Sequence, residues 1–237
     1  MNRNKVSVVT VCRNCSAMLE KTIHSVATLT YPNLEYIVVD GNSVDDTLSI
    51  IKKYESVISQ WVSEPDKGIY DAMNKAVKMA KGDWIIFMNA GDLFASSECI
   101  AKAMEEAEDN DIIYGDVIKG EGVVIRAGQW HNAHRMLFCH QSVFVRTELL
   151  SQYPFDIKHR MSADFKFFKI VGKNGARFAH IDIPVSIFDT SGVSNARRSK
   201  GLADNMSVVC ECDSFLDIVR FMPKLLFPYM ICRLRGK

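Results

Sequence analysis

Carboxylate and amide side chains follow three short apolar runs in the first part of the chain. The polar segments are Asp40, Asp66-Lys67-Gly68 and Asn89-Ala90-Gly91-Asp92. Each stands where a short strand is expected to end and a turn or helix to begin. Open α/β sheets bind nucleotides at the carboxyl ends of their strands, so this pattern predicts a nucleotide-dependent enzyme.

Asp40 is the first candidate for chemistry. A carboxylate at a strand end can accept a hydrogen bond from the imino N–H of uracil or guanine, which would select a nucleobase. The alternative is an aspartate that caps the following turn. Asp66 and Asn89 also lie at expected strand ends, and three polar strand ends on one edge favour a nucleotide site.

Asp92 is the second candidate, as a metal ligand. A diphosphate leaving group carries concentrated negative charge, and a divalent cation, Mg²⁺ or Mn²⁺, held by a carboxylate would stabilise its departure. The alternative is that Gly91-Asp92 only turns the chain before the next helix.

Asp164 is the third candidate, as a general base. It lies in the first turn of an expected helix, Ser162 to Val171, that carries Phe165, Phe167 and Phe168. Apolar surroundings would make its carboxylate a stronger base toward a hydroxyl. A carboxylate favoured by the helix dipole is the alternative, and spacing alone favours that alternative.

His140-Gln141 falls inside a stretch, Leu137 to Val145, that is expected to form a buried strand. Polar side chains there are costly unless they have partners, so they either face an acceptor sugar or form a satisfied pair in the core. Arg13, Lys67 and Arg126 are candidate phosphate partners, with a solvated surface charge as the alternative for each.

The remaining pattern supplies the elements that must position these groups. Short β-branched runs alternate with amphipathic stretches up to Asp116, which predicts an α/β fold with a mostly parallel central sheet flanked by helices. The expected strands are 6–11, one ending at Asp40, 61–62, 84–88 and 112–114. The expected helices include one over 18–27 with Ser16 as its N-cap, one capped by Ser43 or Asp45, 69–80 and 98–108. A two-stranded excursion is expected over 116–130.

Composition restricts the class of protein. The 237 residues carry a formal net charge of +1, which gives no electrostatic case for nucleic acid as a partner. Seven cysteines include one CxxC, Cys12 to Cys15, without the companions of a structural zinc site. Free thiols suit a reducing cytosol, and the run from Val6 to Val11 is too short for the core of a secretion signal. A cytoplasmic protein is therefore expected.

The segment from Phe215 mixes large apolar residues with basic ones. Pro223 and Pro228 predict that any helix there is interrupted. The charge-free run from Leu225 to Cys232 is far shorter than the roughly 20 residues of a membrane-spanning helix. The segment therefore either lies on an anionic membrane surface, at the inner face of the plasma membrane, or docks on the core.

Several of these segments occur together in a known family. Val6 to Asn14, Val38 to Ser43 with Asp46-Thr47, and Asp66-Lys67-Gly68 followed by Ala72, Asn74, Ala76, Ala80 and Gly82 stand in the family's order. Over residues 5 to 195 the chain resembles the family 2 glycosyltransferases with the GT-A fold, of the type that builds bacterial surface polysaccharides.

The resemblance implies roles for particular residues. The first loop and the second block would hold the nucleotide, through Thr10, Val11, Arg13, Asn14, Asp40 and Asn42. Asp66, Lys67 and Gly68 would close around it. Asn89-Ala90-Gly91 stands where the family has an Asp-x-Asp motif that binds ribose and metal. Asn89 and Ala90 would contact the nucleotide, and the change leaves either a shifted metal ligand at Asp92 or a weaker dependence on metal. Asp164 takes the place of the catalytic base, and His140-Gln141 would shape the acceptor pocket.

The resulting prediction is an inverting glycosyltransferase. It would move a sugar from a nucleotide-diphosphate donor, expected to be UDP, to a hydroxyl of a lipid-linked or growing surface glycan. Residues 1–115 would form the donor half, 116–200 the acceptor half of the same domain, and 201–237 a helical tail. A nucleotidyltransferase is disfavoured because no glycine-rich loop follows the first strand. A non-catalytic module that binds sugar nucleotides or glycans is the other alternative.

Overall fold

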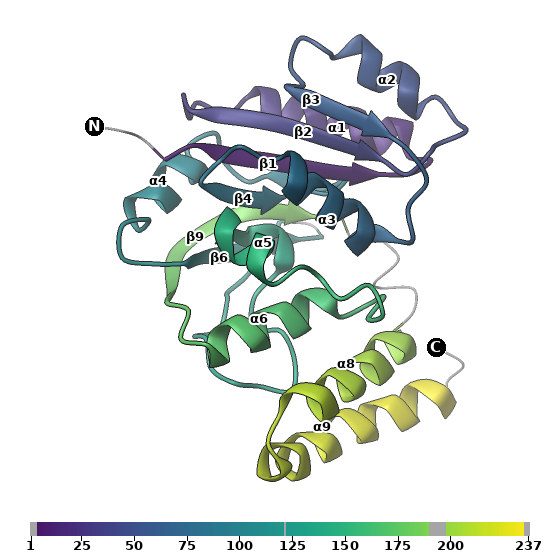
Figure 1. The fold of residues 1–237 in the computed structure, drawn as a ribbon, viewed down its shortest axis with the longest axis vertical. Coiled ribbons are helices and arrows are strands. Elements are labelled where there is room, and N and C mark those ends of the chain that lie inside the picture. Colours follow the sequence, from purple (N-terminus) through teal and green to yellow (C-terminus); the bar gives the residue numbers. More distant parts are fainter. Residues whose placement is uncertain (1–3, 121, 190–197, 235–237) are drawn as a thin grey trace.

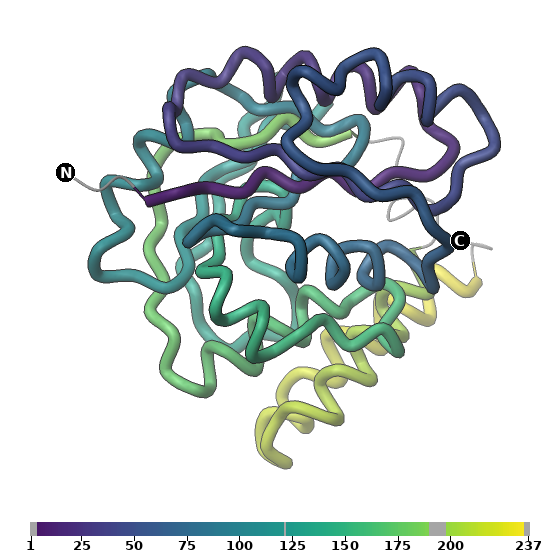
Figure 2. The backbone as a smooth tube through the Cα atoms, turned by 45° about the horizontal axis from the view of Figure 1, so that its top comes forward, coloured from purple at the N-terminus to yellow at the C-terminus, as the bar shows by residue number. Residues whose placement is uncertain are grey.

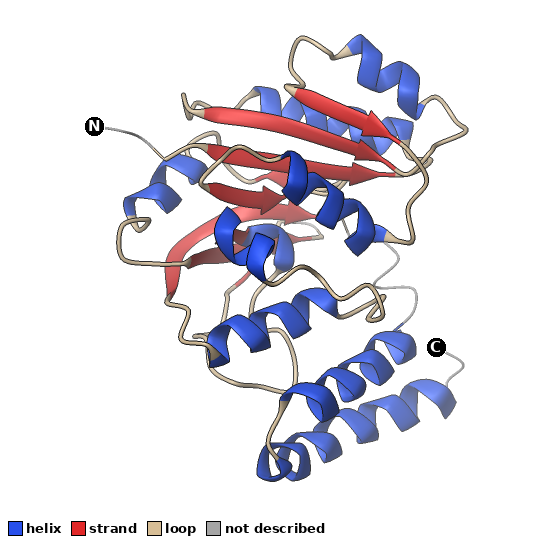
Figure 3. Cartoon of the chain, in the orientation of Figure 1, coloured by secondary structure: helices blue, strands red, loops and turns tan. Residues whose placement is uncertain are grey.

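A nine-stranded sheet runs through the computed structural model, which describes residues 4–120, 122–189 and 198–234. Helices cover both faces of the sheet (Figures 1 and 3). The strands are β1 Val6–Cys12, β2 Leu34–Asp40, β3 Gln60–Ser63, β4 Trp84–Phe87, β5 Leu93–Phe94, β6 Ile112–Lys119, β7 Val123–Ile125, β8 Val143–Arg146 and β9 Phe178–Phe188. The helices are α1 Ser16–Ala27, α2 Thr47–Lys53, α3 Ile69–Met79, α4 Cys99–Glu105, η1 His140–Ser142, α5 Thr147–Gln152, α6 Ala163–Lys173, α8 Arg198–Cys212 and α9 Phe215–Leu234.

The strand order is β3-β2-β1-β4-β8-β6-β9-β5, with β7 paired to β6. β1, β2, β3 and β4 are parallel to one another. β8 is antiparallel to both β4 and β6, and β6 is parallel to β9, so β6 and β9 point in the same direction as β1. This confirms the predicted mostly parallel sheet, and it places the carboxyl ends of these strands along one edge.

β1 is buried along its whole length because helices cover both of its faces. Val8 belongs to the cluster that contains Leu19 of α1, whereas Val9 belongs to the cluster that contains Met73 of α3. Alternate residues of a strand face opposite sides, so a strand between two helical layers reads as a continuous apolar run. Cys12 at the end of β1 pairs with Asp40 of β2, and Asp40 pairs with Ser63 of β3, so these three strands end side by side at one edge of the sheet.

The predicted strand over Leu137 to Val145 is wrong. β8 begins only at Val143, and His140–Ser142 form one turn of 3-10 helix. Ser142 explains the break: its hydroxyl is buried and donates to the carbonyl of Asp116, and it also bonds the hydroxyl of Ser186. Ser16 is likewise not the N-cap of α1, because the helix begins there and no side chain caps it.

The tail forms a helical hairpin, α8 and α9, that lies beside α6 and projects from the body (Figures 1 and 2). α9 is continuous through Pro223 and Pro228, so the predicted interruption is wrong. Each proline removes one backbone donor, but tertiary packing of Phe221 and Leu225 holds the helix together. Within the described residues, none of the helices has the length and apolarity that crossing a bilayer requires.

Candidate active site

A cavity of about 440 Å³ lies at the carboxyl edge of β1 and β4. Its wall joins five segments that are far apart in the sequence: the end of β1 with the start of α1, the entry to α3, the loop after β4, η1, and the end of β9. The lining residues are Val11, Cys12, Arg13, Cys15, Met18, Asp66, Gly68, Ile69, Ala72, Asn89, Ala90, Asp92, Gln141, Phe188 and Asp189. Eight of them were predicted as site residues: Val11, Arg13, Asp66, Gly68, Asn89, Ala90, Asp92 and Gln141.

Asp40 does not line this cavity, and its side chain is fully buried. Its Oδ2 accepts hydrogen bonds from the Ser43 backbone N–H at 2.9 Å and from the Ser63 hydroxyl at 2.6 Å, and its Oδ1 accepts from the Ser43 hydroxyl. Asp40 therefore ties the loop after β2 to the end of β3, which is the turn-capping alternative. A nucleobase contact would have to displace a serine hydroxyl, and that role stays a prediction.

Four other predicted nucleotide residues also lie outside the cavity wall: Thr10, Asn14, Asn42 and Lys67. Thr10 is buried, and its hydroxyl donates to the carbonyl of Met88 at 2.7 Å, which joins β1 to the end of β4. Asn14 and Asn42 both adopt positive φ, 51° and 59°, in the loops after β1 and β2. The Asn14 side chain accepts from the Val44 backbone N–H and so joins these two loops.

The segment Asp66-Lys67-Gly68 forms the entry to α3. Asp66 Oδ1 accepts from the Gly68 N–H at 2.8 Å, and the Lys67 N–H donates to Asp71 of the first helical turn. A β-carbon on Gly41 would collide with the Asp66 carboxylate and would also meet Cδ of Arg13 at 3.3 Å. Glycine at this position therefore leaves room for both side chains at the cavity wall.

Oxygen-bearing side chains gather where the loop after β4 meets the end of β9. Asp92 is only 4% exposed, its Oδ1 accepts from the Asp189 N–H at 2.9 Å, and burial raises its pKa to about 6. Asp189 Oδ2 lies 2.7 Å from where a β-carbon of Gly91 would stand. Asn89 Oδ1 is buried without a hydrogen-bond partner in the described chain. Such a set of oxygen atoms fits a hard divalent cation.

Sequence reasoning missed Asp189. It directly follows β9, so the rule that selected the other strand-end residues would have found it had the strand been recognised.

Asp164 lies in the first turn of α6, and its side chain is 16% exposed. Its Oδ1 accepts from the hydroxyl of Tyr70 at 2.8 Å, and its Oδ2 lies 3.7 Å from Nδ1 of His140. Burial, reinforced by the charge of Asp164, raises the pKa of Tyr70 well above its usual value, so Tyr70 stays protonated and donates. Tyr70 follows the Asp66–Gly68 segment in α3 and was not predicted. It joins the segment expected to hold the donor to the expected base.

His140 lies against the ring of Phe87, with 5.5 Å between centroids and 20° between ring planes. Burial lowers its pKa, against the opposing effect of the nearby Asp164. Neither ring nitrogen has a hydrogen-bond partner among the residues that the structure describes. Gln141, in contrast, accepts from the Cys139 thiol at 3.0 Å. A neutral imidazole with unused hydrogen-bonding capacity thus stands beside Asp164.

A second group of metal-type ligands joins the loop before α6 to α8: Asp156 and His159 come from the loop, and Glu211 comes from α8. Lys166 Nζ already lies between the carboxylates, 2.7 Å from Asp156 Oδ2 and 2.5 Å from Glu211 Oε2. An ammonium group at this point repels a metal ion and satisfies the same oxygen atoms. The group is therefore an ion-pair cluster that anchors the loop.

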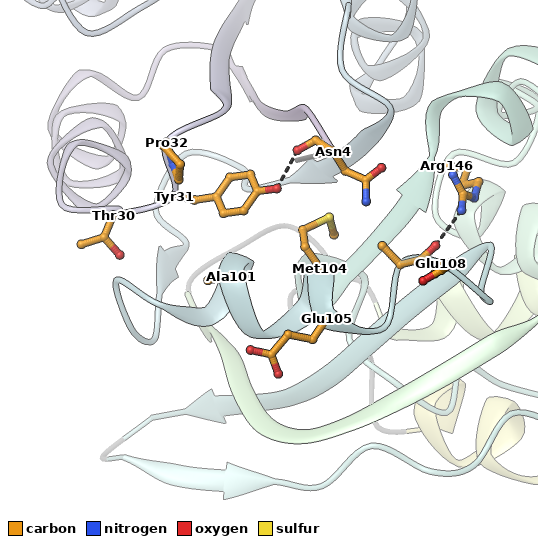
Figure 4. Close-up of a pocket in the computed structure, with 10 residues that line it drawn as sticks. Asn4, Thr30, Tyr31, Pro32, Ala101, Met104, Glu105, Glu108 and Arg146 are labelled. Atoms are coloured by element: carbon orange, nitrogen blue, oxygen red, sulfur yellow. Dashed lines mark hydrogen bonds between the residues drawn. The ribbon is translucent and has the colours of Figure 1, made fainter. Parts of the chain in front are cut away.

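A larger cavity, about 760 Å³, lies at the opposite edge of the sheet, beside the start of β1 (Figure 4). The Tyr31 hydroxyl donates to the Asn4 carbonyl there at 2.6 Å, and Arg146 reaches across from β8. None of the predicted site residues lines it. Size alone therefore does not identify the site.

Known proteins share sequence with this chain over most of its length. The chain is 30% identical to a PGL/p-HBAD biosynthesis glycosyltransferase of Mycobacterium bovis over 96% of this chain and 94% of that protein. It is 35% identical, over 39% of this chain and 38% of that protein, to the Escherichia coli enzyme UDP-Glc:alpha-D-GlcNAc-diphosphoundecaprenol beta-1,3-glucosyltransferase WfaP.

The fold is shared with a solved structure, the mannosyltransferase PcManGT from Pyrobaculum calidifontis in complex with GDP-Man and Mn²⁺. The TM-score is 0.74 at 17% identity, over 95% of this chain and 70% of that one. This likeness confirms the predicted GT-A fold. The model of the family "Glycosyl transferase family 2" matches residues 7–171, and the chain belongs to that family.

Proposed function

We propose that this glycosyltransferase moves a hexosyl group, with inversion, from a nucleoside-diphosphate donor to a hydroxyl of a lipid-linked or growing surface glycan, with UDP as the donor nucleotide. One observation carries the proposal: Asp164 is hydrogen-bonded to Tyr70, which follows the Asp66–Gly68 segment at the wall of the 440 Å³ cavity. Residues 1–115 would serve the donor and 116–200 the acceptor.

In this mechanism Asp164 takes the proton of the acceptor hydroxyl as its oxygen attacks the anomeric carbon. The bond between that carbon and the diphosphate oxygen breaks on the opposite face, and the diphosphate leaves with the electron pair. A single displacement of this kind inverts the configuration. Tyr70 holds Asp164 Oδ1, which leaves Oδ2, beside His140, to face the acceptor.

The donor would be held by the cavity wall. Arg13 and Lys67 offer positive charge to the phosphates, and Asp66 to Gly68 close over the nucleotide. Thr10, Val11, Asn14, Asp40 and Asn42 shape the loops below it, with Asp40 as the proposed partner of the base. His140 and Gln141 border the acceptor.

A divalent cation, Mg²⁺ or Mn²⁺, would be held by Asn89, Asp92 and Asp189. When bound, it would offset the charge of the departing diphosphate. The buried, unpartnered oxygen of Asn89 supports this assignment, as does the Mn²⁺ in the mannosyltransferase complex.

The name of the Escherichia coli relative gives UDP-Glc as its donor and a diphosphoundecaprenol-linked sugar as its acceptor. This supports UDP and a lipid-linked acceptor for the present chain. Work on such an acceptor would place the protein in the cytoplasm, at the inner face of the plasma membrane.

The test is thermal stability against UDP, GDP, CDP and dTDP, each with Mn²⁺ and with chelator. A ligand that binds only the folded state raises the melting temperature. We expect a shift with UDP that chelator reduces. No shift with any nucleotide contradicts the proposal.

Asp164→Asn separates the transferase from the non-catalytic binding module. The variant should keep the UDP shift and lose turnover of UDP-sugar by about 100- to 10,000-fold, the usual contribution of a general base. A wild-type protein that binds UDP but transfers no sugar to any hydroxyl acceptor, and an Asp164→Asn variant that matches it, would favour the binding module.

A further inference from the structure

α9 exposes a continuous apolar face to solvent. Leu216, Val219, Leu226, Phe227, Met230 and Leu234 recur at intervals of three, four or seven residues and are 45 to 86% exposed. Side chains at this spacing lie on one side of a helix. The stripe runs along a 20-residue helix, about 30 Å in length.

The stripe is not the core-facing side of α9. Phe221 and Leu225 point the other way, into a cluster with Phe165 of α6 and with Val208 and Val209 of α8. The helix therefore has one apolar face in the core and a second in solvent, and an exposed apolar face of this extent marks an interaction site.

The acids of the hairpin have partners, whereas its described basic residues have no ionic ones. Asp204 bonds His159, Glu211 bonds Lys166, Asp213 bonds Lys169, and Asp217 accepts from the Ser214 hydroxyl. The basic residues of the hairpin are exposed, and within the described residues none of them forms an ion pair. They are Arg198, Lys200, Arg220, Lys224 and Arg233. The solvent-exposed side of the hairpin therefore carries positive charge.

We propose that α9 lies flat on an anionic lipid surface, with the stripe among the lipid chains and Arg220, Lys224 and Arg233 at the head groups. Apolar burial and attraction of basic residues to anionic lipid act together in such helices. A second copy of the chain fits less well, because a two-fold contact through this face would bring like charges together.

The docking face is coupled to the site through one layer of helix. Phe165, which belongs to the same apolar cluster as Phe221 and Leu225, is the neighbour of Asp164 in α6. Packed helices lie about 8–10 Å apart, so a surface beneath α9 is close to the expected base. This step rests on the proposed function, and it places the reacting hydroxyl of a lipid-linked acceptor near the head groups.

The experiment is flotation of the full chain with vesicles of phosphatidylcholine, alone or mixed with phosphatidylglycerol, without nucleotide sugar. Binding is expected only to the mixed vesicles. Arg220→Gln/Lys224→Gln should weaken it on the order of 30-fold, since each basic residue near an anionic surface is worth about 1 kcal/mol. Leu226→Glu/Phe227→Glu should abolish it.

Two matched controls lie at the other end of the molecule, among α1, α2 and the loop before α2 (Figure 1). Lys21→Gln/Lys52→Gln removes the same charge, and Val44→Glu places a charge at a residue that is 89% exposed. Both should bind as wild type does. Equal binding by the α9 variants and the controls, with circular dichroism melting unchanged, overturns the proposal.

Self-association is a separate outcome. If sedimentation shows a dimer that Leu226→Glu/Phe227→Glu dissociates, and vesicles do not compete with it, α9 is a subunit interface and the lipid proposal is wrong. Vesicle binding requires no turnover, so a chain that binds vesicles but transfers no sugar contradicts only the proposed function.

Discussion

Two regions of the molecule hold α6, the helix that carries Asp164, and they do so by different chemistry. On the cavity side Phe167 and Phe168 of α6 pack in the apolar cluster that contains Tyr70, and the Tyr70 hydroxyl donates a hydrogen bond to the Asp164 carboxylate. On the far side the hairpin uses ion pairs, among them Lys169 with Asp213, whose side chains are both 0% exposed. The difference indicates that buried charge pairs hold α6 on the far side, whereas the cavity side combines apolar packing with one hydrogen bond that orients the Asp164 carboxylate.

Asp213→Ala should have the largest effect on stability. Among the described residues it leaves the buried ammonium of Lys169 with Asn132 as its hydrogen-bond partner and no carboxylate, and an uncompensated buried charge costs about 3–5 kcal/mol. Urea denaturation measures the loss. Lys169→Met/Asp213→Leu removes both charges and should recover most of it. A loss below about 1 kcal/mol in Asp213→Ala would mean that the pair does not hold the hairpin.

Asp92, on the cavity side, should make the free energy of unfolding depend on pH. Burial raises its pKa from 3.8 to about 6, so the folded state holds this proton more tightly than the unfolded chain. Ionisation therefore destabilises the fold, and this contribution to the free energy of unfolding falls by on the order of 2–3 kcal/mol as pH rises from about 4 to about 6.

Asp92→Asn should remove that slope in urea titrations done without divalent cation. Mn²⁺ at pH 7 should raise the melting temperature of the wild type by more than that of the variant, because a cation favours the ionised carboxylate. An unchanged slope in Asp92→Asn would show that the carboxyl does not titrate in this range.

Tyr70→Phe tests the cavity-side contact itself. Hydrogen bonds to charged groups are worth about 1.5–3 kcal/mol, so turnover should fall about 10- to 100-fold with little change in UDP affinity. Tyr54→Phe is the matched control, since that hydroxyl also donates to a carboxylate, Glu20, and neither residue lines the cavity. Equal turnover in the two variants would remove Tyr70 from the mechanism.

Glu211→Gln should have the smallest effect. Glu211 lies two residues from Asp213 and pairs with Lys166, but its side chain is 46% exposed, and Lys166 keeps Asp156 as a partner. Exposed ion pairs contribute about 0–1 kcal/mol. A loss as large as that of Asp213→Ala would show that burial does not set the strength of these contacts.

The pattern of polar residues at strand ends was sufficient to predict that Asp66, Asn89 and Asp92 lie together, because the carboxyl ends of parallel strands meet at one edge of the sheet. It was not sufficient for Asp40, since the serine hydroxyls that enclose its carboxylate come from a loop and from another strand. Asp189 was missed because Pro184 and the polar residues of β9 weaken its strand pattern. Tyr70 has the spacing of an apolar helix residue, and only the fold places its hydroxyl on Asp164.

The pairing of β9 also has a consequence for how the chain folds. Ile112 pairs with Phe178 and Val6 pairs with Trp84, so the centre of the sheet joins segments that are distant in the sequence. Such pairings fold slowly, because the intervening loops must close before the contacts form. Asp189 reaches the cavity only after β9 has docked beside β6. A chain shortened before residue 178 would therefore lack both a strand and part of the proposed cation site.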